Sequence, residues 1–254
     1  MGAFIKKYSI TALLMVVLVA AWVVLTTYSN LLNPVIFPPV ADIVTAFISA
    51  SGELIRGFFS SMGLLIPALA TALILGVGGG LYFGLNARWR EILSPFFHLL
   101  SPLPPTLFIP YAIALLPTFK LASIAILFLG AFWPIFLGTI QGVLLIDRHY
   151  WDNAKTLGLK GKNFLWKVVL PASAPHILSG TGMALTLSFI VLMMAEMFGA
   201  QSGMGQFVVY YTDFSQYDYV LAGLFFNSIV ILSIIVGFEK IKKRILFWTN
   251  LKSE

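Results

Sequence analysis

Long apolar runs separated by short charged segments dominate the chain. A helix needs about 20 apolar residues to cross the hydrocarbon layer of a bilayer. Six runs come close to or exceed that length, at 8–28, 61–85, 92–118, 121–146, 177–198 and 219–238. The runs are continuous rather than alternating, which is typical of helices and not of barrel strands. The pattern therefore predicts an all-α, polytopic membrane helix bundle with six transmembrane helices, the third interrupted by prolines.

The segment between the first two runs, residues 29–60, is predicted to stand apart from the core. Its apolar positions fall at helical spacing: Val40, Ile43, Val44, Phe47 and Ile48. They indicate a short helix that either lies in the membrane interface or packs on the bundle. The expected organisation is an N-terminal unit at 1–60, a core at 61–246 and a tail at 247–254.

Charge is scarce and unevenly distributed. Of the 254 residues, 59% are hydrophobic and 10% are charged, against about 25% charged residues in soluble domains. Most Lys and Arg residues lie before the first run or after the second, fourth and sixth, and only Arg56 and Lys120 lie in the other connections. Connections rich in Lys and Arg face the cytoplasm. We therefore expect a multi-pass protein of the cell (inner) membrane with both termini cytoplasmic.

The net charge of +6 is explained by this orientation and does not indicate a nucleic-acid partner. The basic tail after the sixth run is a topology signal first. Contact with anionic membrane lipid is a secondary role for the same residues.

The connection after the fourth run, residues 147–176, carries the strongest functional signal. Residues 147–157 are predicted to form a short helix, which Gly158 ends because glycine readily takes the left-handed conformation. A second short helix is expected at 162–170, ending at Pro171 because proline lacks the N–H that continues the ladder. The sequence therefore predicts two short helices joined at a glycine corner and projecting from the membrane.

This connection resembles the EAA loop of ABC-importer permeases, whose pattern is Glu-Ala-Ala, three residues, Gly, nine residues, Ile-x-Leu-Pro. The matching positions keep the full spacing, with Asp and Asn in place of Glu and Ala: Asp152, Asn153, Ala154, Gly158, Val168, Leu170 and Pro171. The resemblance implies that these residues couple the chain to an ATPase by docking into a groove on it. It also implies a type I ABC importer permease-like fold. The implied partners are a second permease copy, an ABC ATPase subunit dimer and a periplasmic or lipid-anchored substrate-binding protein.

Further segments are similar to the nitrate, sulfonate and taurine importer permeases, a subfamily whose relatives also carry thiamine precursors. The similar segments are the prolines at 102, 105 and 110, the Gly-Ala-Phe-Trp-Pro-Ile stretch at 130–135, and residues 195–205. The resemblance implies a small anion or a vitamin precursor as the solute. Residues 115–119 depart from the Trp-Phe-Gly segment common in that subfamily. The residues we expect in the translocation path or gate are Pro105, Pro110, Glu196 and Met197.

Glu196 is the clearest acid within an apolar run. A charged side chain at the centre of a membrane helix costs about 2.5–3.5 kcal/mol on insertion scales, so Glu196 should face the bundle interior, a partner or water. Two roles are open: lining the gate or cavity, or bonding to a neighbouring helix. Direct coordination of an anionic solute is disfavoured because like charges repel.

The chain shows no site for chemistry of its own, so it is predicted not to be an enzyme. A P-loop requires Gly-x-x-x-x-Gly-Lys-Ser/Thr, and the nearest stretch, 158–163, has the wrong spacing. The three histidines, His98, His149 and His176, do not have metal-ligand spacing, and cysteine is absent. We expect no cofactor or metal on this chain and no catalytic residues, with ATP and Mg²⁺ on the partner ATPase.

Two alternatives belong to other functional classes. A secondary transporter driven by an ion gradient would need coupling-ion sites near mid-membrane, usually on broken helices. Only Glu196 is a clear candidate, and no inverted repeat is evident. An intramembrane enzyme is the other alternative, and no site for it is visible.

Overall fold

The computed structural model describes residues 13–248 except 15, 18 and 29–32, and within that part of the chain the regular elements are all helices. The α-helices are α2 (Val40–Ser49), α3 (Ser51–Leu85), α4 (Ala87–Leu100), α5 (Ile109–Leu115), α6 (Phe119–Leu144), α7 (Arg148–Thr156), α8 (Gly161–Phe164), α9 (Leu170–Met197), α10 (Met204–Asp213) and α11 (Tyr217–Ile245). Three shorter elements are η1 (Val24–Tyr28), η2 (Pro105–Phe108) and η3 (Leu165–Val169). The all-helical prediction is confirmed for the described residues.

Four described helices are long and apolar enough to cross a membrane: Ser51–Leu85, Phe119–Leu144, Gly161–Met197 and Tyr217–Ile245. The pair Ala87–Leu100 and Pro105–Leu115 is bent by 77° and makes a fifth span if it counts as one. The prolines of the predicted third run break that span, since Pro102, Pro104 and Pro105 cannot continue a helical ladder. The first predicted span, 8–28, lies partly outside the described residues, so six spans are not confirmed.

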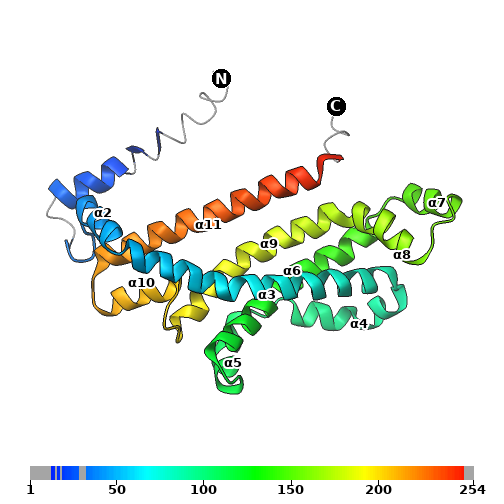
Figure 1. Ribbon diagram of the computed structural model, residues 1–254, viewed down its shortest axis with the longest axis horizontal. Helices are drawn as coiled ribbons and strands as arrows, with labels where there is room; N and C mark the ends of the chain where they lie inside the picture. Colours follow the sequence, from blue (N-terminus) through cyan, green and yellow to red (C-terminus); the bar gives the residue numbers. More distant parts are fainter. Residues whose placement is uncertain (1–12, 15, 18, 29–32, 249–254) are drawn as a thin grey trace.

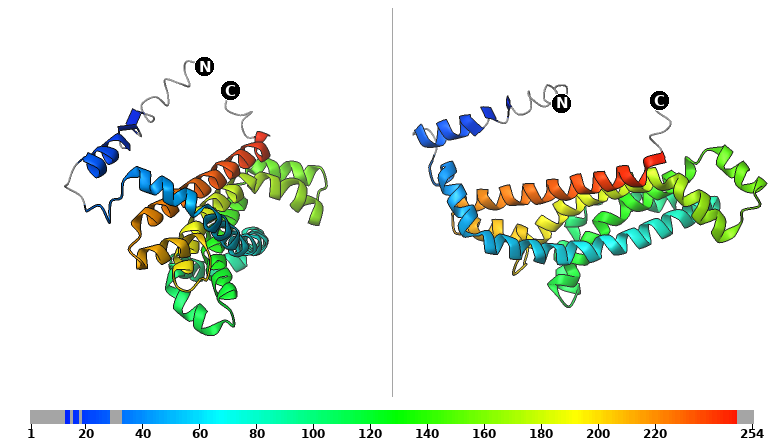
Figure 2. Two further views of the ribbon diagram at one scale, coloured as in Figure 1. Left: turned by 60° about the vertical axis from the view of Figure 1, so that its left-hand side comes forward. Right: turned by 45° about the horizontal axis from the view of Figure 1, so that its top comes forward.

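The spans lie side by side and give the molecule two distinct ends (Figures 1 and 2). We call one the basic end: it carries α7, α8, the start of α4 and the end of α11, with most of the Lys and Arg residues. We call the other the tyrosine end: it carries α2, α10 and the starts of α3 and α11, with Tyr210, Tyr211 and Tyr219. This separation of charge matches the asymmetry expected from the sequence.

The helix α3 begins at Ser51, earlier than the predicted start at residue 61. The charged residues Glu53 and Arg56 end the apolar run without ending the helix, because they lie in its first turns at the tyrosine end. Glu53 is also favourable there, since the helix dipole is positive at the N-terminus. The predicted helix around 40–48 is confirmed as α2, which contacts α11 and α3.

Glycines allow α3, α6 and α9 to approach closely. A Cβ on Gly76 or Gly80 of α3 would lie 2.9 Å from Ile135 or 2.5 Å from Thr139 on α6. The crossing of α6 and α9 is close through the backbone itself, because a Cβ on Gly180 would lie 2.5 Å from the carbonyl oxygen of Pro134. Small residues at helix interfaces permit such packing in membranes. Gly76 and Gly80 are therefore part of a packing surface for α6.

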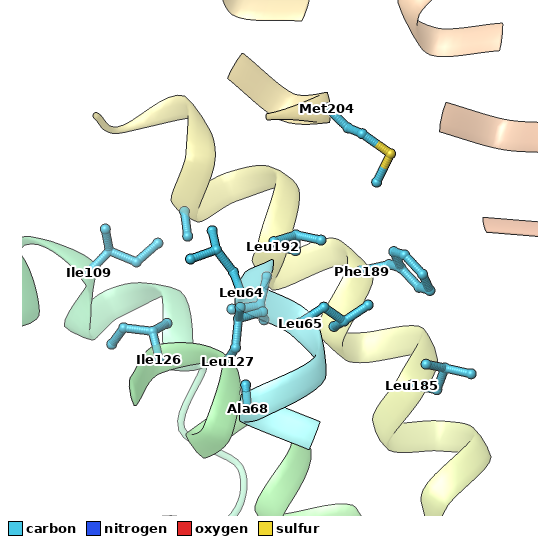
Figure 3. Close-up of a cluster of buried hydrophobic side chains, with 12 residues drawn as sticks. Leu64, Leu65, Ala68, Ile109, Ile126, Leu127, Leu185, Phe189, Leu192 and Met204 are labelled. Atoms are coloured by element: carbon cyan, nitrogen blue, oxygen red, sulfur yellow. The ribbon is translucent and has the colours of Figure 1, made fainter. Parts of the chain in front are cut away.

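The main apolar cluster lies where α3, α6 and α9 meet, with Ile109 of α5 and Met204 of α10 at its edges (Figure 3). Leu65, Leu127, Phe189 and Leu192 are almost fully buried there. In a membrane the alternative surroundings of these side chains are lipid tails, so the cluster holds the helices together by close packing.

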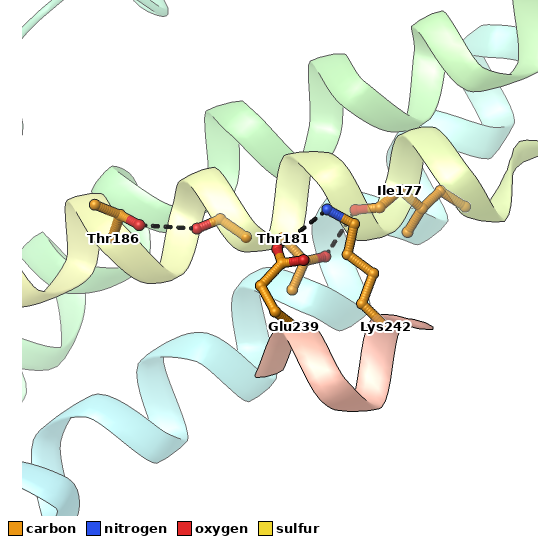
Figure 4. Close-up of polar contacts among 6 residues, drawn as sticks. Ile177, Thr181, Thr186, Glu239 and Lys242 are labelled. Atoms are coloured by element: carbon orange, nitrogen blue, oxygen red, sulfur yellow. Dashed lines mark hydrogen bonds and ion pairs between the residues drawn. The ribbon is translucent and has the colours of Figure 1, made fainter. Parts of the chain in front are cut away.

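Hydroxyl groups within the spans bond mainly to their own helix. Figure 4 shows Thr181 donating to the carbonyl of Ile177 at 2.8 Å on α9. On the adjacent α11, Lys242 donates to Glu239 at 3.2 Å near the basic end. A polar group without a partner costs several kcal/mol in an apolar medium, and hydrogen bonds of this kind avoid that cost.

The second helix of the 147–176 connection does not end at Pro171, which corrects the prediction. The α8 helix passes into the π-helical turn η3 and then into α9, so that Gly161–Met197 forms one helix of 37 residues. Pro171 is the second residue of α9, which begins directly after this π turn. The π turn shifts the hydrogen-bond register just before the proline.

Candidate functional site

An open groove of about 480 Å³ lies between α6, α9 and the bend that follows α4. The bend contributes Ser101, Pro102, Leu103 and Pro105. Its position is held by Phe97 of α4, whose ring lies 4.9 Å from that of Phe136 on α6. The close crossing of α6 and α9 at Gly138 and Gly180 forms part of the wall. The broken third span therefore creates one side of the groove.

Apart from Ser101 of the bend, the polar side chains of the lining lie in one part of this groove. Gln141 of α6 with His176 and Ser179 of α9 lie in the half nearer the basic end. The half nearer the tyrosine end is lined by apolar side chains, including Leu129, Trp133, Leu187 and Val191. A path with an apolar stretch followed by hydrogen-bonding groups resembles the arrangement of a dewetting barrier next to a hydrated site. None of the lining residues is an Asp or Glu.

The four expected path residues lie in three different environments. Pro105 lines the groove. Pro110 lies in α5 and Met197 at the end of α9; both are exposed and neither lines the groove. Glu196 is 1% exposed and also lies outside the groove lining. Any role of the last three in a gate stays a prediction.

The Glu196 carboxylate joins three helices at the tyrosine end. It accepts a hydrogen bond from the Ser61 hydroxyl of α3 at 2.5 Å and another from the Gly205 amide of α10 at 2.7 Å. Ser61 in turn accepts from the Met204 amide at 2.9 Å. Both donors on α10 are first-turn amides, which have no partner within their own helix. The sequence left two roles open for Glu196, and these contacts favour the one in which it bonds to neighbouring helices.

The connection between α6 and α9 begins with the expected corner. Asp147 caps α7 by accepting from the His149 amide at 2.9 Å. The Gly158 amide then donates to the backbone carbonyl of Lys155 at 3.0 Å. The Leu159 amide donates to the backbone carbonyl of Ala154 at 2.9 Å. These two bonds are the Schellman pattern, which requires a left-handed residue, and Gly158 has φ +65°.

The EAA-like residues gather around a cavity of about 380 Å³ at the basic end. Asn153, Ala154, Val168 and Pro171 line it, together with Trp248 from beyond α11. Asp152 is exposed and pairs with Lys155 at 3.7 Å; an exposed ion pair of this kind is worth little. Leu170 and Gly158 do not line the cavity. Leu157 and Trp166 nearby are 73% and 65% exposed, which leaves apolar surface available for a partner.

A second open cavity, of about 610 Å³, lies near the start of α6. It is lined by Ser60 and Gly63 of α3, by Thr118 to Lys120, and by the 199–202 segment that follows α9. Lys120 forms no ion pair with any described residue and is the cation of this cavity. The lining includes no acid.

Aromatic side chains cluster at the tyrosine end where α2, α3, α10 and α11 meet. The rings of Tyr211 and Tyr219 stack at 4.5 Å, and the Tyr211 hydroxyl donates to Glu53 at 2.9 Å. Burial, followed by this bond to Glu53, raises the pKa of Tyr211 to about 12. The hydroxyl therefore stays protonated across the physiological range and keeps the link between α10 and α3.

Sequence reasoning did not single out Gln141 or Ser179, and it considered His176 as a metal ligand and not as a path residue. The structure places all three on the groove wall. A lone polar residue in an apolar run carries little signal by itself. The available signal was the combination of small and polar residues on matching faces of two runs.

Residues 72–246 match the family model described as binding-protein-dependent transport system inner membrane component. That range contains the groove and the EAA-like loop. The chain belongs to this family. It is therefore a permease of the ABC-transporter class, as the loop motif predicted, and family members of this kind work with ATPase and binding-protein partners.

Individual permeases match over most of the chain. A putative ABC transporter permease protein of Methanocaldococcus jannaschii is 29% identical over 97% of this chain and 93% of its own length. The taurine transport system permease protein TauC of Escherichia coli is 27% identical over 92% of this chain and 87% of its own length. The bicarbonate transport system permease protein CmpB of Synechococcus elongatus is 31% identical over 73% of this chain and 66% of its own length.

The fold of the permease also matches a solved structure. A chain of the MetNI methionine ABC transporter, solved in inward-facing conformations, aligns with a TM-score of 0.67 at 18% identity. The alignment covers 78% of this chain and 98% of that chain. At this identity the likeness concerns the fold.

Proposed function

We propose that this chain is the translocating permease subunit of an ABC importer for a small anion, which an external binding protein delivers. The groove between α6, α9 and the bend after α4 is the observation that carries the proposal. It offers hydrogen-bond donors from Gln141, His176 and Ser179, and its lining contains no carboxylate that would repel an anion.

The names of the relatives agree with this solute class. Permeases named for taurine, aliphatic sulfonates, bicarbonate and nitrate all match the chain at 27–31% identity. Each named solute carries an anionic group. The cavity that contains Lys120 has no acid in its lining, and its single cation favours attraction of anions.

In this proposal the basic end faces the cytoplasm and the tyrosine end faces the binding protein, through segments 29–60 and 200–217. ATP and Mg²⁺ are bound by a partner ATPase dimer that docks on the EAA-like loop. A second permease copy covers the open side of the groove. Binding and hydrolysis of ATP then shift the pair of permeases between two states that expose the groove to opposite sides. ATP shifts this equilibrium because it binds more tightly in one state than in the other.

The experiment is reconstituted uptake. The chain is inserted in proteoliposomes with its ATPase, and the loaded binding protein is added to the side of the tyrosine end. We expect ATP-dependent uptake of one of taurine, an alkanesulfonate, nitrate or bicarbonate, with no uptake driven by an ion gradient alone. Uptake that follows an ion gradient without ATP would support the secondary-transporter alternative and contradict the proposal.

A further inference from the structure

One continuous helical stretch, with the π turn η3 within it, connects the two ends of the molecule. Gly161–Met197 contains 37 residues, which at 1.5 Å per residue is about 55 Å. It starts just after the glycine corner of the EAA-like loop and ends at the tyrosine end, with Glu196 in its last turn. A displacement of the loop at the basic end therefore has a direct route to Glu196.

Beyond Met197 the chain itself is a poor route for movement. Phe198, Gly199, Gln201 and Ser202 are exposed, and a Cβ on Gly199 would touch only the ring of Phe119, at 3.6 Å. The firm link from α9 to α10 is instead through space. Gly205 packs against the backbone of Met193, and the Glu196 carboxylate holds the Gly205 amide.

Both groups that face the carboxylate, the Ser61 hydroxyl and the Gly205 amide, donate to it. A glutamine keeps one oxygen for the Gly205 amide but turns its NH2 toward Ser61. The Ser61 hydroxyl must then rotate to accept, and the charge-assisted bond between Ser61 and the carboxylate is lost. Asn227 of α11 secures the same turn from the other side by donating to the Met204 carbonyl at 3.2 Å.

The neighbouring glycine leaves the space that the carboxylate needs. The backbone at Gly203 is extended, a conformation open to any residue. A Cβ there would lie 2.6 Å from both carboxylate oxygens of Glu196. Glycine is therefore required at 203 for space and not for conformation.

We propose that Glu196, with Ser61, is a positioning residue that fixes α10 to the outer end of α9. Through it, movement of the EAA-like loop is transmitted to the tyrosine-end surface, and occupancy of that surface is transmitted back to the loop. The inference rests on the proposed function, because it assigns a binding-protein partner to one end and an ATPase to the other. Glu196 acts here through α10 and does not touch the solute.

The test uses the reconstituted complex of the chain with its ATPase, and measures ATP hydrolysis with and without loaded binding protein. Coupling between two sites is typically worth about 5- to 150-fold, so we expect Glu196→Gln, Ser61→Ala and Gly203→Ala each to lower the stimulated-to-basal ratio at least about fivefold. Basal hydrolysis and the amount of assembled complex should stay near the wild-type values. The double variant of Glu196→Gln and Ser61→Ala should be no worse than the stronger single variant, because both change one network.

Matched controls separate this role from general packing. Gly199→Ala lies in the same segment with room for a methyl group, and Ser188→Ala removes a buried hydroxyl of α9 that has no described partner. Both should keep the wild-type ratio. Variants of the network that assemble and keep that ratio, or that lower basal and stimulated rates in proportion, would overturn the inference. Ser61→Ala decides the question if Glu196→Gln does not assemble. A wild-type complex that binds no ATPase or that no binding protein stimulates contradicts the proposed function itself, and the inference with it.

Discussion

At the scale of the residue, glycine is used for different physical reasons in different places. Gly158 has φ +65°, and no atom lies within 4 Å of the point that a Cβ would occupy, so its requirement is conformational. Gly180 has helical backbone but lies against the carbonyl of Pro134, so its requirement is space. Gly78 on α3 has neither constraint. The same substitution should therefore have three different outcomes.

The corner of the EAA-like loop gives the first prediction. Gly158→Val places a β-branched side chain in the left-handed region, at a cost of about 1–2 kcal/mol for a non-glycine residue. We expect a corner that no longer holds α7 against α8 and a several-fold loss of ATPase co-purification, at a normal membrane level of the chain. Gly78→Val is the control, since its surroundings are equally open and its φ is helical. Normal ATPase binding by Gly158→Val would contradict the role given to the corner.

Lys120 gives a second prediction at this scale. A single cation in a cavity without acids raises the local concentration of anions. Lys120→Gln should lower uptake at limiting solute by about threefold to tenfold, with a larger loss at low ionic strength, as expected for an effect of charge. Arg56→Gln removes the other base at this end without changing the cavity lining and should have little effect. Equal losses in both variants, or no dependence on salt, would show that Lys120 does not attract the solute.

The two kinds of site residue differ in how far they could be predicted. Gly158 and its neighbours were predictable because a corner is local, with all its bonds within a few residues. The partners of Glu196 were not, because Ser61 lies 135 positions away and becomes a neighbour only when α3 packs on α9. His176 was missed for the same reason, since only the approach of α6 to α9 places it on a groove.

At the scale of the element, the crossing of α6 and α9 determines the groove wall. Gly180→Ala would force the two backbones apart, and overpacking of this kind costs about 1–3 kcal/mol. We expect a lower thermal unfolding midpoint in detergent and reduced uptake. Gly237→Ala in α11, where nothing lies within 4 Å, is the matched control and should be neutral. A Gly180→Ala variant as stable as the control would mean that the crossing is looser than described.

Helix positions followed from apolar runs, but exact helix ends and the geometry of breaks did not. The run from 92 to 118 was expected to be one span interrupted by prolines, and the sequence did not predict that they would bend it by 77°. Conversely, Pro171 looked like a stop, and a π turn carries the helix past it. In both cases hydrogen-bond register decides the outcome, and hydropathy contains no information on register.

At the scale of the whole molecule, the separation of basic and tyrosine ends follows from the distribution of charge along the chain. The fold of that molecule is shared with a chain of the MetNI transporter at 18% identity. Sequence motif and fold thus agree on the class of protein. Motif and fold do not specify the solute, because the few polar groups that line the groove would bind any of several small anions.

The absence of cysteine from the chain makes movement of the whole molecule measurable. Ser179→Cys places a single thiol on the polar half of the groove. Without nucleotide, the thiol should react with a membrane-impermeant reagent added on the side of the basic end, because a hydrated thiol ionises and the thiolate is the nucleophile. With ATP bound under non-hydrolysing conditions, that reactivity should fall by at least about tenfold, the scale of a two-state population shift.

The control for this experiment is a thiol that no change of state should affect. Ser228→Cys lies on an exposed apolar face of α11, where we expect lipid to suppress ionisation in both states. It should stay unreactive throughout. Protection of Ser179→Cys by nucleotide, together with new reactivity from the side of the tyrosine end, is the pattern of a groove that opens alternately to the two sides. Equal reactivity in both nucleotide states would contradict such a change, and reactivity only from the tyrosine end would reverse the orientation.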